Sequence, residues 1–351
     1  MKVLITGIAG FIGSAVAEKL VSLGNEVVGV DNINDYYDIN LKYNRLQALG
    51  IAPQTASEWG LKVKSEKWPG LTFIRMDITS GEELEKLFSN EKFDRVVHLA
   101  AQPGVRYSIS RPRAYIESNI NGFLNILECC RKSNVAHLVF ASSSSVYGLN
   151  GKIPFKEEDS AEHPVSLYAA TKKSNEMMAH AYSSIYGLPV TGLRFFTVYG
   201  PWGRPDMSPF LFMEGIIQGK PIKVFNKGDM LRDFTYIDDI AESVSRILEV
   251  IPAEDKDWDA INADPSTSSA PYRIYNVGNQ RPTKLLDYIS EIESAIGKEA
   301  SKEMLPMQAG DVYQTGADSS ALAKATGFKP STSLHDGIKK TVEWFCSYYG
   351  Y

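Results

Sequence analysis

Tyr168 and Lys172 lie four residues apart, and a run of four serines, Ser142 to Ser145, precedes them in the chain. On a helix, side chains at this spacing share a face, so an ammonium group would lie beside a phenol. A nearby positive charge favours the phenolate and lowers a pKa that is about 10 in its absence. Such a tyrosine can exchange a proton with a substrate hydroxyl near neutral pH, which is general acid–base catalysis. A surface tyrosine beside a solvated lysine has the same spacing, so the pair needs support from the rest of the chain.

The first thirty residues form a strand–turn–helix–strand pattern. An apolar strand at residues 2–6 leads into three glycines at three-residue spacing, and a second apolar strand at residues 26–30 is followed by Asp31. Glycines in such a turn let the backbone approach a pyrophosphate, and the N–H groups at the helix N-terminus bind the anion. The glycines also interrupt the apolar N-terminal run, which argues against a signal peptide. The predicted dinucleotide site is formed by Gly7, Gly10 and Gly13.

Asp31 lies 18 residues after Gly13, where a carboxylate can accept hydrogen bonds from the hydroxyl groups of an adenosine ribose. The same carboxylate would repel a 2′-phosphate, and neither Asn32 nor Ile33 supplies a cation that would bind one. The sequence therefore predicts NAD, in preference to NADP, as the cofactor.

The composition is that of an ordinary globular enzyme, with 351 residues of which 44% are hydrophobic and 23% charged, enough for one large domain or two modest ones. The net charge of −5 gives no basic stripe for nucleic acid, and no apolar stretch reaches the roughly 20 residues that span a membrane. We therefore expect that the protein binds neither nucleic acid nor a membrane. The three cysteines make no disulfide framework and suit the cytoplasm. The five histidines lack metal-ligand spacing, so we expect no metal site.

Strands alternate with helices through the first half of the chain, which predicts a parallel sheet with helices on both faces. We expect an α/β fold, with a Rossmann-type doubly wound sheet and a smaller, interleaved C-terminal α/β domain. The NAD-binding domain would comprise residues 1–190 and about 234–262, and the second domain residues 191–233 and about 263–351. The predicted strands span residues 2–6, 26–30, 71–76, 95–101, 137–142, 190–196, 223–225 and 273–277. The predicted helices span residues 82–88, 113–133, 209–218, 238–250, 283–296 and 334–348, and another begins just after Pro164.

Ligands of such sheets bind beyond the carboxyl ends of the strands. The serine run ends the predicted strand at residues 137–142, and the helix with Tyr168 and Lys172 follows, so both motifs would lie beside the cofactor. This placement favours the catalytic interpretation of the tyrosine and the lysine. Residues 32–70 are longer than a usual connection; we expect a helix at residues 40–49 and assign the segment no function.

Taken together, these motifs resemble the extended short-chain dehydrogenase/reductases, NAD-dependent enzymes that act on nucleotide sugars. The resemblance covers essentially the whole chain and includes Arg194–Pro201 as a further motif. Within the family, the chain is most similar to the UDP-glucuronate 4-epimerases. That similarity rests on Ala101–Ser108, Thr197–Met207, Val224–Tyr236 and Met307–Asp311.

The resemblance implies a role for each matching residue. Ser143 would be the catalytic serine that binds O4 of the sugar beside Tyr168, and Lys172 would also bind the nicotinamide ribose. The residues that would bind or surround the cofactor are Gly7, Gly10, Phe11, Ile12, Gly13, Asp31, Asn32, Asp77, Ile78, Leu99, Ala100, Ala101, Asn119, Ser142, Tyr168 and Lys172. The residues that would contact the uridine and its phosphates are Val224, Phe225 and Arg232, and Ser144 or Ser145 would reach a sugar carboxylate.

Two positions depart from the relatives that act on neutral hexoses. Thr197 stands where an Asn is common, and Gln308 stands where an Arg often precedes a Gly-Asp pair; both favour the glucuronate subgroup. Arg204 would bind the C6 carboxylate through its planar guanidinium, with a surface ion pair to Asp206 as the alternative. Arg106 would bind either the carboxylate or the diphosphate.

The resemblance implies an NAD-dependent isomerase that interconverts UDP-glucuronate and UDP-galacturonate through a transient 4-keto intermediate. Tyr168, as the phenolate, would take the O4 proton, and tightly bound NAD would be regenerated in each turnover. Alternatives on the same scaffold are a UDP-glucose 4-epimerase and a UDP-glucuronate decarboxylase, and a more remote one is a non-catalytic NAD-sensing regulator. The resemblance also implies a homodimer through the helices at residues 113–133 and 168–187, although packing within one chain would explain their apolar stripes equally well.

Overall fold

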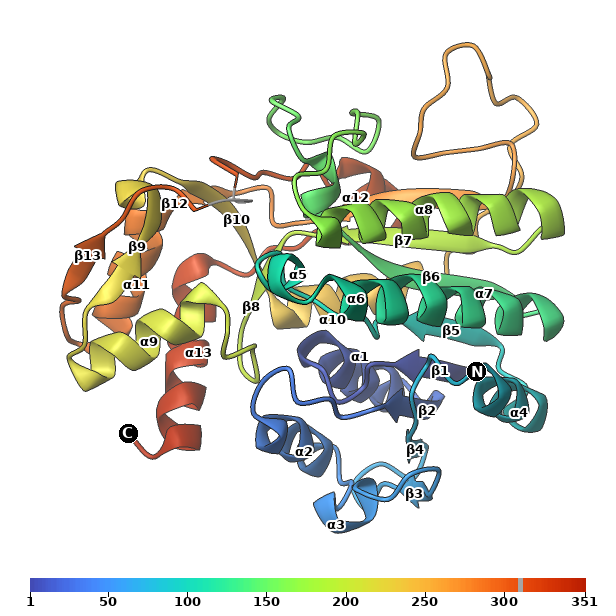
Figure 1. Cartoon of the computed structure of the whole chain (residues 1–351), viewed down its shortest axis with the longest axis horizontal. Helices are drawn as coiled ribbons and strands as arrows, with labels where there is room; N and C mark the ends of the chain where they lie inside the picture. The colour runs from blue at the N-terminus through green and yellow to red at the C-terminus, as the bar shows by residue number, and fades with distance from the viewer. Residues whose placement is uncertain (309–311) are drawn as a thin grey trace.

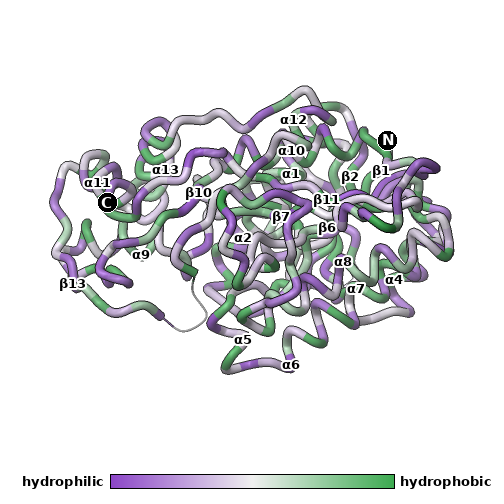
Figure 2. Tube along the Cα trace, turned by 90° about the horizontal axis from the view of Figure 1, so that it is seen from above, coloured by the Kyte–Doolittle hydropathy of each residue, from purple (hydrophilic) through white to green (hydrophobic). Residues whose placement is uncertain are grey.

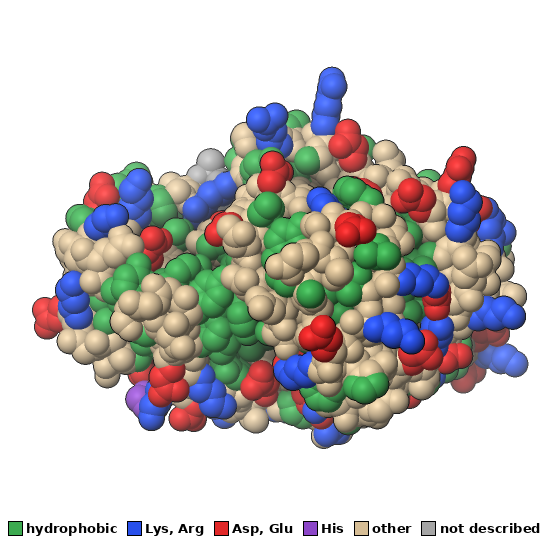
Figure 3. All heavy atoms as spheres, turned by 90° about the horizontal axis from the view of Figure 1, so that it is seen from below, with side chains coloured by type: hydrophobic (Ala, Val, Ile, Leu, Met, Phe, Trp, Pro, Cys, Tyr) green, Lys and Arg blue, Asp and Glu red, His purple; other side chains and the backbone are tan. Residues whose placement is uncertain are grey.

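The computed structural model describes residues 1–308 and 312–351, so the last three residues of the Met307–Asp311 motif lie outside the described part of the chain. The chain folds into a larger lobe, which contains the N-terminus, and a smaller lobe, which contains the C-terminal helix (Figure 1). Seen from below, hydrophobic side chains gather between the two lobes (Figure 3). No helix of the described residues is both long enough and apolar enough to cross a bilayer.

The larger lobe is built on a sheet that has eight strands among the described residues, in the order β11-β7-β6-β5-β1-β2-β4-β3. Neighbouring strands run parallel except for β3 and β4, which are antiparallel. All six residues of the central strand β7 are buried, as expected for a strand that is covered on both faces of the sheet. The predicted doubly wound α/β sheet is confirmed. Its strands are β1 (Lys2–Thr6), β2 (Glu26–Asp31), β3 (Lys62–Lys64), β4 (Leu71–Arg75), β5 (Arg95–His98), β6 (His137–Ser143), β7 (Val190–Phe195) and β11 (Tyr272–Val277).

Helices cover both faces of this sheet (Figure 1). One face packs against α1 (Phe11–Ser22), α2 (Ile39–Ala48), α10 (Ile237–Ile247) and α12 (Ser320–Thr326). The other face packs against α4 (Gly81–Glu91), α7 (Gly122–Lys132) and α8 (Leu167–Tyr186). Along the outer helices, hydrophobic and hydrophilic residues alternate along the tube, as expected when only one side of a helix is buried (Figure 2).

The smaller lobe has a hydrophobic core of its own. A sheet in the order β12-β10-β8 and a pair formed by β9 and β13 contribute to it. The strands are β8 (Thr197–Tyr199), β9 (Ile222–Val224), β10 (Leu231–Tyr236), β12 (Pro282–Lys284) and β13 (Lys302–Met304). The helices are α9 (Ser208–Gln218), α11 (Leu285–Ile296) and α13 (Leu334–Tyr349).

Three sequence-based expectations need correction. The predicted division assigned residues from 191 and from 263 onwards to the second domain, but β7 and β11 are paired along their length within the large sheet. The other boundaries of the division stay a prediction. The helix expected at residues 113–133 comprises α6 (Pro112–Tyr115), the π-helical turn η1 (Ile116–Asn121) and α7. The helix expected from residue 283 begins at Leu285, because Pro282–Lys284 pair with β10.

Candidate active site

A cavity of about 1030 Å³ lies between the two lobes. It opens at the carboxyl ends of β1 and β5, where the order of the sheet reverses direction, which is the usual ligand position in such folds. Most residues that the sequence predicted for the site line this one cavity. They are Gly7, Gly10, Phe11, Ile12, Gly13, Asp31, Asn32, Asp77, Ile78, Leu99, Ala100, Ala101, Arg106, Ser142, Ser143, Ser144, Tyr168, Lys172, Thr197, Arg204, Phe225 and Arg232.

The glycine-rich turn after β1 has no room for side chains. Gly7 has a φ of +77°, and a Cβ atom there would lie 2.8 Å from the backbone nitrogen of Ala100. A Cβ atom on Gly13 would lie 2.0 Å from the carbonyl oxygen of Gly7. Helix α1 begins directly after Gly10, so its free N–H groups are at the cavity wall. These residues fit the pyrophosphate of a dinucleotide, which needs close backbone approach and a helix N-terminus.

Asp31, at the end of β2, is buried and anchors two backbone segments. Its carboxylate accepts hydrogen bonds from the N–H of Ala9 at 3.1 Å and from the N–H of Ile33 at 2.8 Å. The Asn32 amide donates to Oδ2 of Asp77 at 2.8 Å. Burial alone would raise the pKa of Asp77, but hydrogen bonds from Asn32 and Thr79 hold it below its ordinary value. The end of the cavity that was predicted to hold the adenosine is therefore polar and internally bonded.

Tyr168 lies in the first turn of α8, and the hydroxyl of Ser143 interacts with its phenol. Burial raises the pKa of Tyr168, while the Ser143 hydroxyl and the positive charge of Arg204 act in the opposite direction. Lys172 is also buried, and its amine donates a hydrogen bond to the carbonyl oxygen of Ala141 at 2.9 Å. Burial lowers the pKa of Lys172 to about 8. Arg204 is a cation that lowers the pKa of Tyr168, and the expectation that Lys172 does so as well stays a prediction.

The serine run makes the turn from β6 into the short helix η2 (Ser144–Tyr147). Ser143 is the N-cap residue, and its hydroxyl oxygen accepts a hydrogen bond from the N–H of Ser145 at 3.2 Å. The hydroxyl of Ser142 donates to Oε1 of Glu176 on α8 at 2.6 Å. Glu176 in turn pairs with Arg194 on β7, with Nε and Oε1 2.8 Å apart and both side chains 1% exposed. This buried ion pair fixes α8, and therefore Tyr168, against the ends of β6 and β7.

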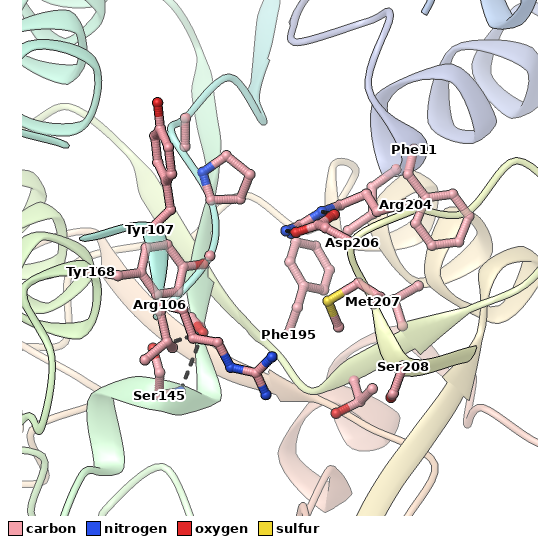
Figure 4. A pocket seen from close by; sticks show the side chains of 18 of the residues that line it. Phe11, Arg106, Tyr107, Ser145, Tyr168, Phe195, Arg204, Asp206, Met207 and Ser208 are labelled. Atoms are coloured by element: carbon pink, nitrogen blue, oxygen red, sulfur yellow. Dashed lines mark hydrogen bonds and ion pairs between the residues drawn. The ribbon is translucent and has the colours of Figure 1, made fainter. Parts of the chain in front are cut away.

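Arg204 and Asp206 lie in the loop between β8 and α9, across the cavity from Tyr168 (Figure 4). Asp206 accepts hydrogen bonds from Nε of Arg204, at 3.0 Å, and from Nη2. The ion pair that was the alternative interpretation of Arg204 is thus present, but it lies inside the cavity rather than on the outer surface. Burial alone would lower the pKa of Arg204, and the charge of Asp206 raises it. Thr197, the first residue of β8, lines the same cavity.

Two cations and an aromatic ring line the end of the cavity in the smaller lobe. The guanidinium carbon of Arg106 lies 5.4 Å from the ring centroid of Phe225. Arg232, on β10, donates a hydrogen bond to the carbonyl oxygen of Val312 at 2.6 Å. A partly buried aromatic ring and guanidinium groups suit a base and a diphosphate.

Asn119 and Val224 do not line the cavity, contrary to expectation. Asn119 lies in the π-helical turn η1, and its side-chain oxygen accepts a hydrogen bond from the N–H of Gln102 at 2.7 Å. Its neighbour Ser118 lines the cavity instead. Val224 is fully buried in the core of the smaller lobe, and the following residue, Phe225, reaches the cavity.

Apart from Asn32, sequence reasoning missed the cavity residues of the segment 32–70, to which it assigned no function. Tyr36 and Lys42 both line the cavity. The amine of Lys42 donates to the carbonyl oxygen of Asn34 at 2.8 Å, and its charge interacts with that of Asp31. A cation therefore lies near Asp31 although the residues next to it in sequence supply none. The one feature of the sequence that could have indicated these cavity residues is the high content of Tyr and Asn in the segment.

Comparisons with known proteins match nearly the full length of the chain. The sequence model of the NAD-dependent epimerase/dehydratase family matches residues 3–278. Protein CapI of Staphylococcus aureus is 50% identical over 99% of this chain and 99% of its own length. A probable UDP-glucuronate 4-epimerase of Rhizobium meliloti is 44% identical over 98% of this chain and 97% of its own. The crystal structure of UDP-glucuronic acid 4-epimerase from Bacillus cereus, in complex with UDP-glucuronic acid and NAD, has a TM-score of 0.85 and 32% identity, covering 99% of this chain and 100% of that one.

Proposed function

The chain belongs to the NAD-dependent epimerase/dehydratase family, and we propose that it interconverts UDP-glucuronate and UDP-galacturonate by inverting C4 of the sugar. The observation that carries the proposal is the position of Tyr168 and Arg204 on opposite sides of one cavity (Figure 4). Tyr168 supplies a group that transfers protons, and Arg204 supplies a cation for a sugar carboxylate. The relative from Rhizobium meliloti and the neighbour from Bacillus cereus, which are named for this activity, support the same assignment.

The residues at the carboxyl ends of β1 and β2 hold the cofactor. The glycine-rich turn and the start of α1 bind the pyrophosphate of NAD, Asp31 binds the adenosine ribose, and Lys172 binds the nicotinamide ribose. Bound NAD accepts a hydride from C4 of the sugar and returns one to the opposite face of that carbon. At the far end of the cavity, Phe225 and Arg232 hold the uridine diphosphate.

Tyr168 takes the proton from O4 and later returns one, and Ser143 orients that oxygen by a hydrogen bond. Burial opposes the phenolate, so the Ser143 hydroxyl and the charge of Arg204 assist its formation. Because Lys172 is bonded to the backbone of β6, its part is to bind and to orient rather than to exchange the proton.

The carboxylate of the sugar must be held in a restricted orientation. The 4-keto form of a uronic acid is a β-keto acid, and it loses carbon dioxide when its C5–C6 bond aligns with the carbonyl π system. Arg204, Thr197 and Ser144 line the cavity and hold the carboxylate out of that alignment. Arg204→Ala is expected to lower turnover and to release a UDP-pentose, and unchanged kinetics would contradict this role.

Two further expectations belong to the proposal. The first is a homodimer in which two copies pair through α7 and α8, because these helices and η1 expose large hydrophobic side chains: Ile116, Leu124, Met177, Ile185 and Tyr186. Light scattering should then give twice the chain mass of 38.9 kDa, and a monomer would contradict it. The second is a cytoplasmic location, which the three free cysteines support.

The proposed activity is tested by incubating the purified protein with UDP-glucuronate, with and without added NAD, and separating the products. UDP-galacturonate without net NADH is the expected result. A UDP-pentose with carbon dioxide would identify a decarboxylase instead. Conversion of UDP-glucose alone would show that Arg204 and Thr197 have been assigned the wrong role.

A further inference from the structure

Two loops from different lobes meet at the cavity. One is the loop after β2, residues 32–38, and the other is the loop before α9, residues 200–207. Arg45, whose side chain is 1% exposed, is hydrogen-bonded to both loops. Its Nε and Nη2 donate to the carbonyl oxygen of Trp202 at 3.0 and 2.7 Å, and its Nη1 donates to the hydroxyl of Tyr37 at 2.6 Å. The two loops therefore have a fixed relative position.

The course of the first loop is set at Asp31. Ile33 has a φ of +52°, an unfavourable conformation for a β-branched residue. The hydrogen bond from its N–H to the Asp31 carboxylate, at 2.8 Å, and its burial hold it there. The loop that follows carries Tyr36 to the cavity wall. The residue proposed to bind the adenosine ribose thus also directs Tyr36.

Tyr36 is held tightly in place at that wall. Its hydroxyl donates a hydrogen bond to Oδ2 of Asp206 at 2.9 Å. Its ring packs edge-on against Tyr107, with the centroids 4.8 Å apart. A Cβ atom on Gly104 would lie 2.5 Å from the Tyr36 hydroxyl, so the glycine leaves room for it. Burial and the charge of Asp206 raise the pKa of Tyr36 to about 12, so the phenol stays a donor at neutral pH.

Asp206 uses only one edge of the Arg204 guanidinium. It accepts from Nε and from Nη2, whereas a guanidinium has five N–H donors in a rigid plane. Among the described residues, no hydrogen bond of Arg204 engages Nη1. The Asp206 contact therefore fixes the plane of the guanidinium and leaves its other edge available to a second carboxylate.

We propose that Tyr36 and Asp206 are positioning residues that aim the free edge of Arg204 at the carboxylate of the sugar. This inference rests on the proposed function. Tyr36 holds Asp206, Asp206 holds Arg204, and the loop that bears Tyr36 starts at Asp31. Recognition of the carboxylate in the smaller lobe thereby depends on a loop that is fixed at the cofactor site of the larger lobe.

Loss of this positioning has a chemical signature. When the carboxylate of the 4-keto sugar is no longer held, the C5–C6 bond breaks and leaves its electron pair on the C4 carbonyl as an enolate. Carbon dioxide departs, C5 takes up a proton, and return of the hydride to C4 gives a UDP-pentose. A purely structural defect would lower all activity without changing the ratio of UDP-pentose to UDP-galacturonate.

The test compares Tyr36→Phe and Asp206→Asn with Tyr182→Phe in the full-length protein. Tyr182 makes the same kind of phenol–carboxylate bond, to Glu128 at 2.7 Å, between α7 and α8. For each variant, kcat, KM, the pentose share of the product, the NAD content and the melting temperature are measured. Tyr36→Phe should lower kcat/KM for UDP-glucuronate about tenfold, the effect of one hydrogen bond to a charged group. It should also raise the pentose share at unchanged NAD content, and Asp206→Asn should do both more strongly.

Two results would overturn the inference. One is a Tyr36→Phe protein with the rates and product ratio of Tyr182→Phe, and the other is a loss of activity that follows loss of NAD alone. A wild-type protein that makes no UDP-galacturonate would instead overturn the proposed function. The two failures are therefore distinguishable.

Discussion

The amine of Lys172 lies 2.9 Å from the carbonyl oxygen of Ala141, so the lysine is bonded to the backbone of β6. Its spacing from Tyr168 had suggested a direct effect on the phenol, but the structure uses the lysine to join α8 to the end of a central strand. The groups that assist the phenolate are Ser143 and Arg204. In the proposed mechanism, Arg204 therefore links proton transfer at Tyr168 to binding of the sugar carboxylate.

Tyr168→Phe should abolish the proton transfer and leave the cavity otherwise intact. The expected loss in kcat is about 100-fold to 10,000-fold, the usual contribution of a general acid–base group. Because the aromatic ring remains, the NAD content and the melting temperature should match those of the wild type. Rate assays with UDP-glucuronate check this, and a variant with near wild-type turnover would remove Tyr168 from the mechanism.

Gly7→Ala should prevent cofactor binding, and Gly24→Ala is its matched control. Both glycines have positive φ, +77° and +82°, so alanine costs each about 1–2 kcal/mol of backbone strain. Only at Gly7 does the added Cβ meet the backbone of Ala100, and at Gly24 no atom lies within 4 Å. Chemical unfolding and NAD titration should show a larger loss of stability for Gly7→Ala, and loss of NAD binding for that variant alone. Equal behaviour of the two variants would contradict the tight turn.

Glu157 should make stability depend on pH. Burial raises the pKa of its carboxyl from 4.5 to about 7 in the folded protein. The folded state therefore binds the proton more strongly than the unfolded state, so this stabilising contribution is complete below pH 4.5 and is lost as the pH rises through about 7. Glu157→Gln, which keeps an acceptor for the N–H of Asn276, should remove the dependence. Urea unfolding at pH 5 and pH 8 measures it, and a constant difference between the two proteins would exclude Glu157 as the source.

The sequence correctly predicted those strands and helices whose hydrophobic pattern and end signals lie within one short segment. β1 has the expected bounds, Lys2–Thr6, because its apolar run is bounded by the glycine turn. The short strands β8, β12 and β13 were missed, because three residues are too few for a period-two pattern and each is held by pairing with a distant segment. β11 was found as a strand but placed in the wrong domain, because its partner β7 precedes it by about eighty residues and pairing is not visible in the sequence.

In the candidate site, too, the sequence predicted the residues on local motifs and missed contacts between distant segments. Residues on motifs, such as the glycine turn and Tyr168, lie where the sequence placed them. The hydrogen bond between Tyr36 and Asp206 joins residues 170 positions apart, and no periodic pattern in the sequence predicts such a contact. Asn119 was assigned to the cavity by the resemblance alone, and in the structure its side chain is bonded to the backbone of Gln102 and to the hydroxyl of Thr171.

The most direct test of the central claim uses UDP-glucuronate that carries deuterium at C4. The purified protein is incubated with this substrate in ordinary water, and the UDP-galacturonate is isolated and analysed by mass spectrometry and NMR. Inversion at C4 by transfer to bound NAD and back predicts a product that keeps its deuterium at C4. Loss of the label to water would contradict the account, because C4 would then be inverted by proton exchange rather than by hydride transfer within the cavity.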